Sequence, residues 1–183
     1  RKTIMFEETR KNIGSILARL YFRQNSYQQK DFSKLYTNAN SALVIVPEDS
    51  QLSSLVFPFL NSVQQKFRGN KLTLVTSAPF KISPGPLSQS KIITISQEQL
   101  GFFFLPKSGL VDRLLREKFD LIVDLNISVV PFALYLCRGM NAPLKVGFVK
   151  KYSDATYNFQ FNTDPLRMPK IRYEQLYRTL TMF

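Results

Sequence analysis

The chain has 183 residues, 44% of them hydrophobic and 13% aromatic, which is enough for one domain with a substantial core. Its 25 Lys and Arg outnumber 13 Asp and Glu, and the net charge of +12 predicts a phosphate-bearing partner: RNA, DNA, an anionic membrane surface or a nucleotide sugar. The absence of histidine excludes histidine general bases, Ser-His-Asp triads and His-ligated metal sites, and the single cysteine, Cys137, excludes an internal disulfide.

The N-terminal segment is predicted to form one basic amphipathic helix, over residues 5–23. Its apolar residues recur at helical spacing and form a candidate hydrophobic docking stripe: Ile13, Ile16, Leu17 and Leu20. Two interpretations stay open, because the helix can pack on the flank of its own domain or dock on a membrane or a partner. Residues 24–40 are polar and aromatic without a strong period, which is typical of a linker. We therefore divide the chain into residues 1–40, helix and linker, and residues 41–183, the α/β domain.

Apolar runs of strand length alternate with helical patterns through the body of the chain. The predicted strands are residues 42–46, 71–77, 91–96, 119–125 and 144–148, with a short edge strand at 156–161. Helices are predicted over residues 109–117, 129–137, 169–182 and 52–67, with Ser108 as an N-cap and Pro131 in a first helical turn. The alternation predicts an α/β fold: a doubly wound, mainly parallel, Rossmann-like sheet with an extra N-terminal helix. The first and fourth strands should be central neighbours.

Folds of this class bind ligands where the strand order reverses, and here that point follows the first strand, at residues 47–51. The sequence there is PEDSQ, with neither a G-x-G-x-x-G nor a G-x-x-x-x-G-K-[ST] motif. It has no glycine to let a phosphate approach the backbone, and it carries two acidic residues, Glu48 and Asp49. We therefore expect no bound dinucleotide or other cofactor, no metal and no small-molecule ligand.

Several stretches together resemble one enzyme family. They are, in order, ALVIVPEDSQLSSLVFPFL with Pro58 in its apolar end, KLTLVTS, LVDRLLREK, FDLIVDL, a strand ending in Gly147 and Phe148, and IRYEQLYRTL. From residue 42 to the C-terminus this order is similar to the N-terminal half of glycosyltransferase family 9, the bacterial heptosyltransferases that build lipopolysaccharide cores. The resemblance implies half of a GT-B fold and, in an active enzyme, transfer of a sugar from a nucleotide sugar.

The sequence departs from this family where its catalytic base is expected. The resemblance implies a Gly-Asp turn after the first strand, and counting back from Pro58 places Gln51 and Leu52 there. Leucine cannot take a proton, and Asp49 is a weak candidate because it stands at the wrong spacing. Family members also have a second half that carries most of the nucleotide-sugar site, and we expect that half to be missing from this chain.

Three hypotheses follow. The chain is a non-catalytic glycosyltransferase-like binding or assembly module; or it is the acceptor-binding N-terminal half of a family 9 enzyme; or it is a basic accessory subunit of an RNA-protein particle or of a membrane complex. We predict a macromolecular, anionic partner and a cytoplasmic location, at the periphery of the inner membrane if the N-terminal helix docks there.

The excess of basic residues lies toward the two ends of the chain. They would form a single exposed surface if the two terminal helices pack on the same side of the domain, and otherwise they are the solvated charges of a basic soluble protein. The candidate anion-binding or partner-binding residues are Arg10, Lys11, Arg19, Arg23, Lys150, Lys151, Arg167, Lys170, Arg172 and Arg178.

Overall fold

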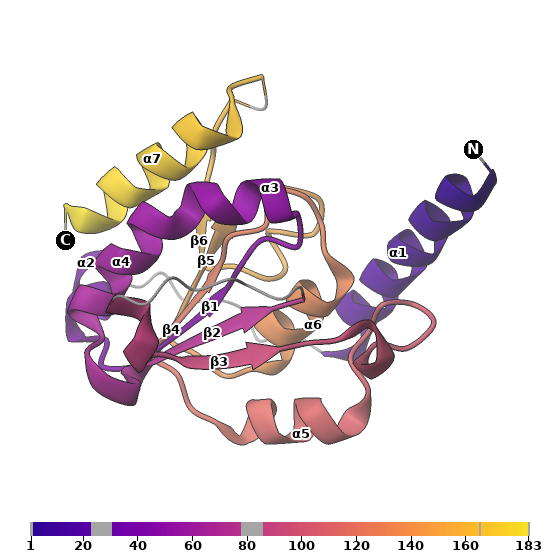
Figure 1. The fold of residues 1–183 in the computed structure, drawn as a ribbon, viewed down its shortest axis with the longest axis horizontal. Coiled ribbons are helices and arrows are strands. Elements are labelled where there is room, and N and C mark those ends of the chain that lie inside the picture. The colour runs from indigo at the N-terminus through magenta and orange to yellow at the C-terminus, as the bar shows by residue number, and fades with distance from the viewer. Residues whose placement is uncertain (1, 23–30, 78–85, 165, 183) are drawn as a thin grey trace.

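A computed structural model describes residues 2–22, 31–77, 86–164 and 166–182. Within these residues, six strands form one parallel sheet in the order β3-β2-β1-β4-β5-β6 (Figure 1). The strands are β1 (Ala42–Ile45), β2 (Leu72–Thr76), β3 (Lys91–Thr94), β4 (Leu121–Asp124), β5 (Leu144–Phe148) and β6 (Phe159–Phe161). The first and fourth strands pair at the centre, with Ala42 opposite Leu121, so the predicted α/β, doubly wound sheet is confirmed.

The residues of β1, β2, β4 and β5 are buried because helices cover both faces of the sheet. Side chains along β1 alternate between the faces: Val44 packs with α4 (Phe57–Lys66), α7 (Pro169–Thr181) and α2 (Phe32–Asn38). Leu43 and Ile45 pack instead with α5 (Ser108–Arg116) and α6 (Pro131–Gly139). Each face therefore has its own apolar core.

The N-terminal helix, α1 (Lys2–Tyr21), packs along α6. A Cβ placed on Gly14 would lie 3.3 Å from the Cβ of Pro131, and one placed on Gly139 would lie 2.5 Å from the ring of Phe22. The two helices therefore run parallel, with the second half of α1 beside α6. Since α6 begins just past the carboxyl ends of the strands, the first half of α1 projects beyond the sheet (Figure 1).

Three sequence predictions need correction. The predicted linker contains α2, whose N-cap Asp31 accepts a hydrogen bond from the backbone N–H of Lys34. The helix predicted over residues 52–67 is three pieces: α3 (Ser50–Ser53), a 3₁₀ turn (Ser54–Val56) and α4, which begins at the Phe57–Pro58 pair because proline favours a first helical turn. Ser108 is not an N-cap but the first residue of α5, which follows Lys107 and has no side-chain cap.

The described parts of the chain contain four short 3₁₀ turns. Besides the turn at Ser54–Val56, they lie at Gly69–Lys71, Pro86–Gln89 and Gln97–Gln99. In the loops of the described parts, two non-glycine residues have a positive φ, Phe104 at 58° and Tyr152 at 70°. Such angles are costly for aromatic residues, and surrounding contacts must hold them. Both lie under cations of α1, as described below.

Candidate functional site

The strand order reverses between β1 and β4, which places the candidate site at the carboxyl ends of these two strands. The loops that leave β1 and β4 meet there, because the two strands are neighbours. Glu48, in the loop after β1, donates its backbone N–H to Oδ1 of Asn126, in the loop after β4, over 2.9 Å. The sequence therefore brings two segments that are far apart in the chain to one point.

A buried carboxylate stands at the centre of this site. Asp124, the last residue of β4, is 1% exposed. Its Oδ2 accepts from Lys150 Nζ at 2.7 Å and from the Tyr157 hydroxyl at 2.5 Å, and its Oδ1 accepts from the backbone N–H and the Nδ2 of Asn126. Lys150 also donates to the carbonyl oxygen of Asn126. We call Glu48, Asp124, Asn126, Lys150 and Tyr157 the switch-point network.

The electrostatics of the network favour structure over proton transfer. A buried carboxylate is costly unless it is paired and hydrogen-bonded, and Asp124 has both a cation and hydrogen-bond donors. Burial, reinforced by the negative charge of Asp124, raises the pKa of Tyr157 well above its ordinary value. The phenol therefore stays protonated and acts as a donor. Burial likewise raises the pKa of the Cys137 thiol, so this cysteine is a core residue and not a nucleophile.

The loop after β1 shows how the resemblance fails locally. Asp49 is exposed, and its carboxylate accepts a hydrogen bond from the backbone N–H of Gln51 at 2.8 Å, as the N-cap of α3. Leu52 lies within α3 and packs against the core. The weak catalytic candidate is thus used as a helix cap.

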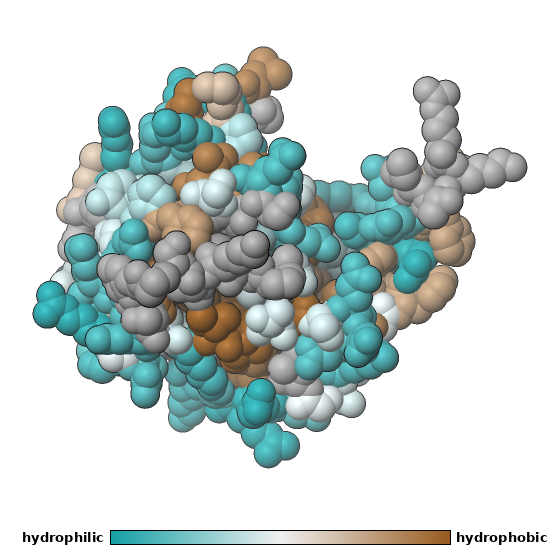
Figure 2. Space-filling model, viewed as in Figure 1, coloured by the Kyte–Doolittle hydropathy of each residue, from teal (hydrophilic) through white to brown (hydrophobic). Residues whose placement is uncertain are grey.

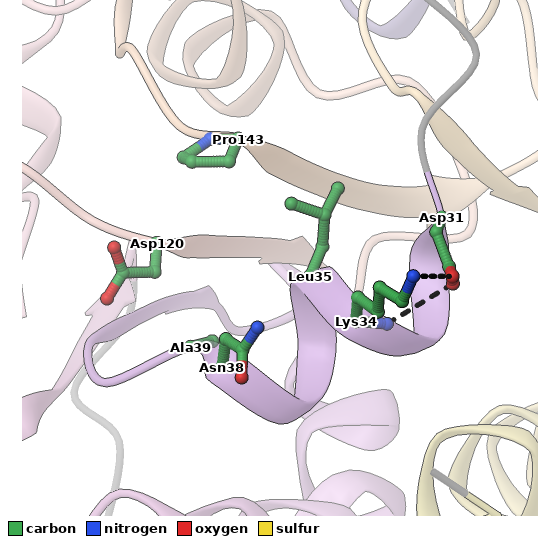
Figure 3. A pocket seen from close by; sticks show the side chains of 7 residues that line it. All are labelled: Asp31, Lys34, Leu35, Asn38, Ala39, Asp120 and Pro143. Atoms are coloured by element: carbon green, nitrogen blue, oxygen red, sulfur yellow. Dashed lines mark hydrogen bonds and ion pairs between the residues drawn. The ribbon is translucent and has the colours of Figure 1, made fainter.

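Two pockets in the described part of the chain have no lining residue from the switch-point network. One, of about 360 Å³, opens at the amino ends of the strands and is lined by Asp31, Lys34, Leu35, Asn38, Ala39, Asp120 and Pro143 (Figure 3). Its Asp120 carboxylate accepts from the backbone N–H groups of Asn40 and Ser41 and from the Ser41 hydroxyl. A second, of about 230 Å³, lies between the α3–α4 segment and α7, and is lined by Ser54, Leu55, Pro58, Phe59, Lys170, Tyr173, Glu174 and Tyr177. Among the described residues, no group of three or more His, Cys, Asp or Glu side chains could hold a metal ion.

The basic residues predicted on α1 lie against aromatic rings and carbonyl groups. Arg10 donates Nε to the carbonyl of Phe102 and stacks over the Phe102 ring, 4.1 Å from its centroid. Lys11 forms ion pairs with Glu7 and with Glu48 of the switch-point network. Both cations also lie over the ring of Phe104, at 5.0 and 5.3 Å. These contacts attach α1 to the loop after β3.

The other end of α1 is held in the same way. Arg19 and Lys151 both lie over the ring of Tyr152, 5.7 and 5.0 Å from its centroid. Arg138, in the last turn of α6, donates to the carbonyls of Arg19 and Phe22. Arg23 lies outside the described residues. Cation–π contacts thus accompany both positive-φ aromatic residues, Phe104 and Tyr152.

The basic residues of α7 do not join those of α1. α7 covers the opposite face of the sheet, so the condition for a single basic surface from both terminal helices is not met (Figure 1). Lys150 is in the switch-point network, and Arg172 is buried, donating Nε to the Thr163 hydroxyl at 2.6 Å. The exposed members are Lys151, Arg167, Lys170 and Arg178. The structure brings Arg19 and Lys151 together, and the binding role of all these residues stays a prediction.

The hydrophobic docking stripe does not cover the domain's own flank. The residues that α1 buries against the domain are small: Gly14, Ser15 and Ala18. The stripe itself is open, with Ile13, Ile16, Leu17 and Leu20 exposed by 38, 44, 36 and 70%. In the described part of the chain, no helix has the length and apolarity that crossing a membrane requires.

Sequence reasoning missed most of the switch-point network. It noted Lys150 as an anion-binding residue and connected neither it nor Asn126 and Tyr157 with Asp124. One signal was available: a carboxylate at the end of a buried strand must find partners, and Asp124 ends such a strand. Nothing in the sequence indicated that these partners would come from the loops after β4 and β5.

Residues 15–183, most of the chain, match the family described as "Family of unknown function (DUF6913)". The chain belongs to this family. The fold of DUF6913 seen here is similar to that of a solved structure, E. coli heptosyltransferase WaaC with ADP, with a TM-score of 0.53 and 18% identity. The likeness covers 75% of this chain and 46% of the enzyme, so this DUF6913 chain spans about half the length of the heptosyltransferase. It supports a glycosyltransferase-like, Rossmann-like half domain. No curated protein matches the sequence.

Proposed function

We propose that this DUF6913 chain is a non-catalytic, glycosyltransferase-like module that binds a macromolecular anionic partner, an RNA-protein particle or a membrane surface. The observation that carries the non-catalytic part is the switch-point network. Its carboxylate, Asp124, is matched by Lys150, Tyr157 and Asn126, and is 1% exposed. A carboxylate that is buried and fully hydrogen-bonded stabilises the fold. It cannot act as a general base, because a general base must reach the proton that it removes.

The loop after β1 supports the same conclusion. Sugar transfer to a hydroxyl group requires a base beside the acceptor. Asp49 accepts the backbone N–H of Gln51 as the N-cap of α3, and Gln51 and Leu52 occupy the positions that correspond to the family's Gly-Asp turn. An uncharged amide and an alkyl side chain cannot replace a carboxylate.

Charge supports the anionic partner. The net charge of +12 repels itself in a compact state, and a negatively charged partner relieves this repulsion. Lys151, Arg167 and Lys170 are exposed and can approach such a partner without breaking the core.

The test has two arms. The purified chain is incubated with ADP- and UDP-sugars, and we expect no nucleotide release above a blank; release that Asp49→Asn abolishes would contradict the non-catalytic part.

The chain is then applied to heparin, a generic polyanion, and to anionic vesicles at rising salt. We expect retention at low salt that weakens steeply, because phosphate and sulfate contacts release counterions. If neither surface retains the chain at low salt, the anionic partner is wrong.

A second candidate function is the acceptor-binding half of a sugar transferase. The likeness to a heptosyltransferase over 75% of this chain favours it. The distinguishing measurement is calorimetric titration with a lipopolysaccharide core oligosaccharide. Saturable binding that Asp49→Asn weakens would support this alternative over the module.

A further inference from the structure

We propose that the outward face of α1, together with Phe102, docks on an anionic lipid bilayer. This proposal deepens the anionic partner of the proposed function and rests on it. The outward face is defined by six exposed apolar residues of α1: Met5, Phe6, Ile13, Ile16, Leu17 and Leu20.

The orientation of α1 is the first step. Gly14 and Ala18 are buried, and a Cβ on Gly14 would overlap the carbonyl oxygen of Phe103. The small residues therefore allow close contact with the domain. Ile16 is two residues from each of them, which places it on the opposite side of a helix with about 3.6 residues per turn. The helix is thus amphipathic with its apolar side turned outward.

The apolar surface continues beyond the helix. Phe6, 58% exposed, meets Phe102, 59% exposed, in an edge-on contact with 6.3 Å between ring centroids. Phe102 belongs to the loop after β3, at the carboxyl ends of the strands. Figure 2 shows hydrophobic surface at the projecting end of α1. An exposed apolar strip of this kind indicates an interaction surface.

Charges border this strip on both sides. Arg10 and Arg19 are nine residues apart, or about two and a half turns, so they lie on opposite edges of the helix. Their contacts agree: Arg10 lies against Phe102 on one side, and Arg19 lies with Lys151 around Tyr152 on the other. Glu7 pairs with Lys11, whose other partner is Glu48 of the domain, so this carboxylate is on the inward side. Glu8 is exposed and lies three turns before Arg19 on the same edge, where Arg19 and Lys151 outnumber it. An apolar strip whose edges have a net positive charge is complementary to a bilayer whose headgroups are anionic.

Other occupants fit less well. RNA would contact outward-facing cations, whereas Arg10 and Lys11 are held on aromatic rings and the outermost side chains are apolar. A second copy would bring another chain of net charge +12 against the same cationic edges. The bilayer satisfies the apolar strip and both edges at once.

The experiment uses the whole chain and vesicles of phosphatidylcholine with or without phosphatidylglycerol. We expect the chain to float with phosphatidylglycerol vesicles and not with pure phosphatidylcholine. Leu20→Glu should weaken binding at least tenfold, because the leucine side chain would be buried in the bilayer and this burial would be lost. The matched control is Leu166→Glu, since Leu166 is 93% exposed and precedes α7 on the other face. Lys151→Glu should weaken binding at least fivefold, by the order of one lost cation near the surface, and Lys71→Glu should not.

A fluorescence measurement protects the test from a misfolded variant. The chain has no tryptophan, so Leu20→Trp and Leu166→Trp each introduce one reporter. We expect phosphatidylglycerol vesicles to shift the emission of Leu20→Trp to the blue and to leave that of Leu166→Trp unchanged.

Three outcomes overturn the inference. Retention on heparin without flotation on vesicles leaves the proposed function standing and removes the bilayer. Failure on both surfaces removes both. Concentration-dependent self-association without vesicles, abolished by Leu20→Glu, assigns the strip to a second copy.

Discussion

The two terminal helices both have an apolar stripe, and they turn it in opposite directions. α7 directs Tyr173, Leu176 and Leu180 into the core, where they are 2, 1 and 1% exposed. α1 directs its small residues to α6 and leaves its stripe open, with Leu20 70% exposed. An apolar stripe predicts that something covers that face of the helix, and the residues opposite the stripe indicate whether the domain itself can do so. In α1 the small residues let the helix pack closely on the domain through the side opposite the stripe, so the domain does not bury the stripe.

Among substitutions that test this comparison, the largest loss of stability is expected in α7. Leu176→Ala removes a side chain that is 1% exposed and leaves a cavity in the core, and should lower the free energy of unfolding by about 2–5 kcal/mol. Urea denaturation followed by circular dichroism measures it. Glu174→Ala, on the exposed side of the same helix, should stay within about 0.5 kcal/mol. A loss below about 1 kcal/mol for Leu176→Ala would mean that α7 is not part of the cooperative core.

A smaller effect is expected where α1 meets the domain. A Cβ on Gly14 would lie 1.9 Å from the Phe103 carbonyl oxygen, so Gly14→Ala must shift α1 or the loop after β3. We expect a loss of about 1–3 kcal/mol, as in overpacked cores. Gly109→Ala is the control, because a Cβ there meets nothing within 4 Å, and alanine favours a helix by up to about 1 kcal/mol. Hydrogen exchange should show faster exchange in α1 for Gly14→Ala and unchanged exchange in β4.

Much of the fold could be predicted because buried parallel strands have a strong signature. The runs that became β1 and β4 have few polar residues, and helical patterns separate them, which leaves little freedom in the topology. α2 could not be predicted in this way, since seven residues with the sequence FSKLYTN have no clear period. It forms because Asp31 caps it and Tyr36 is buried against the core.

The next prediction concerns the polar anchor of α7. The Tyr173 hydroxyl donates to the Leu125 carbonyl at 2.8 Å, and Tyr173→Phe should cost about 1 kcal/mol. Burial, followed by the charge of Asp124, raises the pKa of Tyr173. A pKa that is raised in the folded state gives stability below the ordinary tyrosine value of about 10, which is lost as the pH rises above it. Unfolding measured between pH 8 and 11 should therefore show a shallower alkaline loss for Tyr173→Phe, and equal slopes would contradict the raised pKa.

The candidate site was less predictable than the fold. The sequence showed that residues 47–51 lack a phosphate-binding motif, which depends on local residue types. It could not show that Lys150 turns inward to Asp124, because that contact joins residues 26 positions apart through the arrangement of β4 and β5. The same limit applied to Arg10 and Lys11. Their charge suggested a phosphate ligand, whereas in the structure they lie over the rings of Phe102 and Phe104.

The smallest effect is expected for the open stripe, and it tests the comparison most directly. Leu20→Ser replaces a side chain that is 70% exposed, so little apolar area changes its environment, and the free energy of unfolding should change by less than about 0.5 kcal/mol. The matched substitution Leu180→Ser, in α7, removes a side chain that is 1% exposed and should cost several times more. Both are measured by urea denaturation at two protein concentrations. A cost for Leu20→Ser that approaches that of Leu180→Ser and is independent of concentration would mean that the domain itself covers the stripe. A cost that grows with concentration would mean that a second copy covers it. A near-zero cost at both concentrations leaves the stripe uncovered in the isolated chain, which is the condition that docking on a bilayer requires.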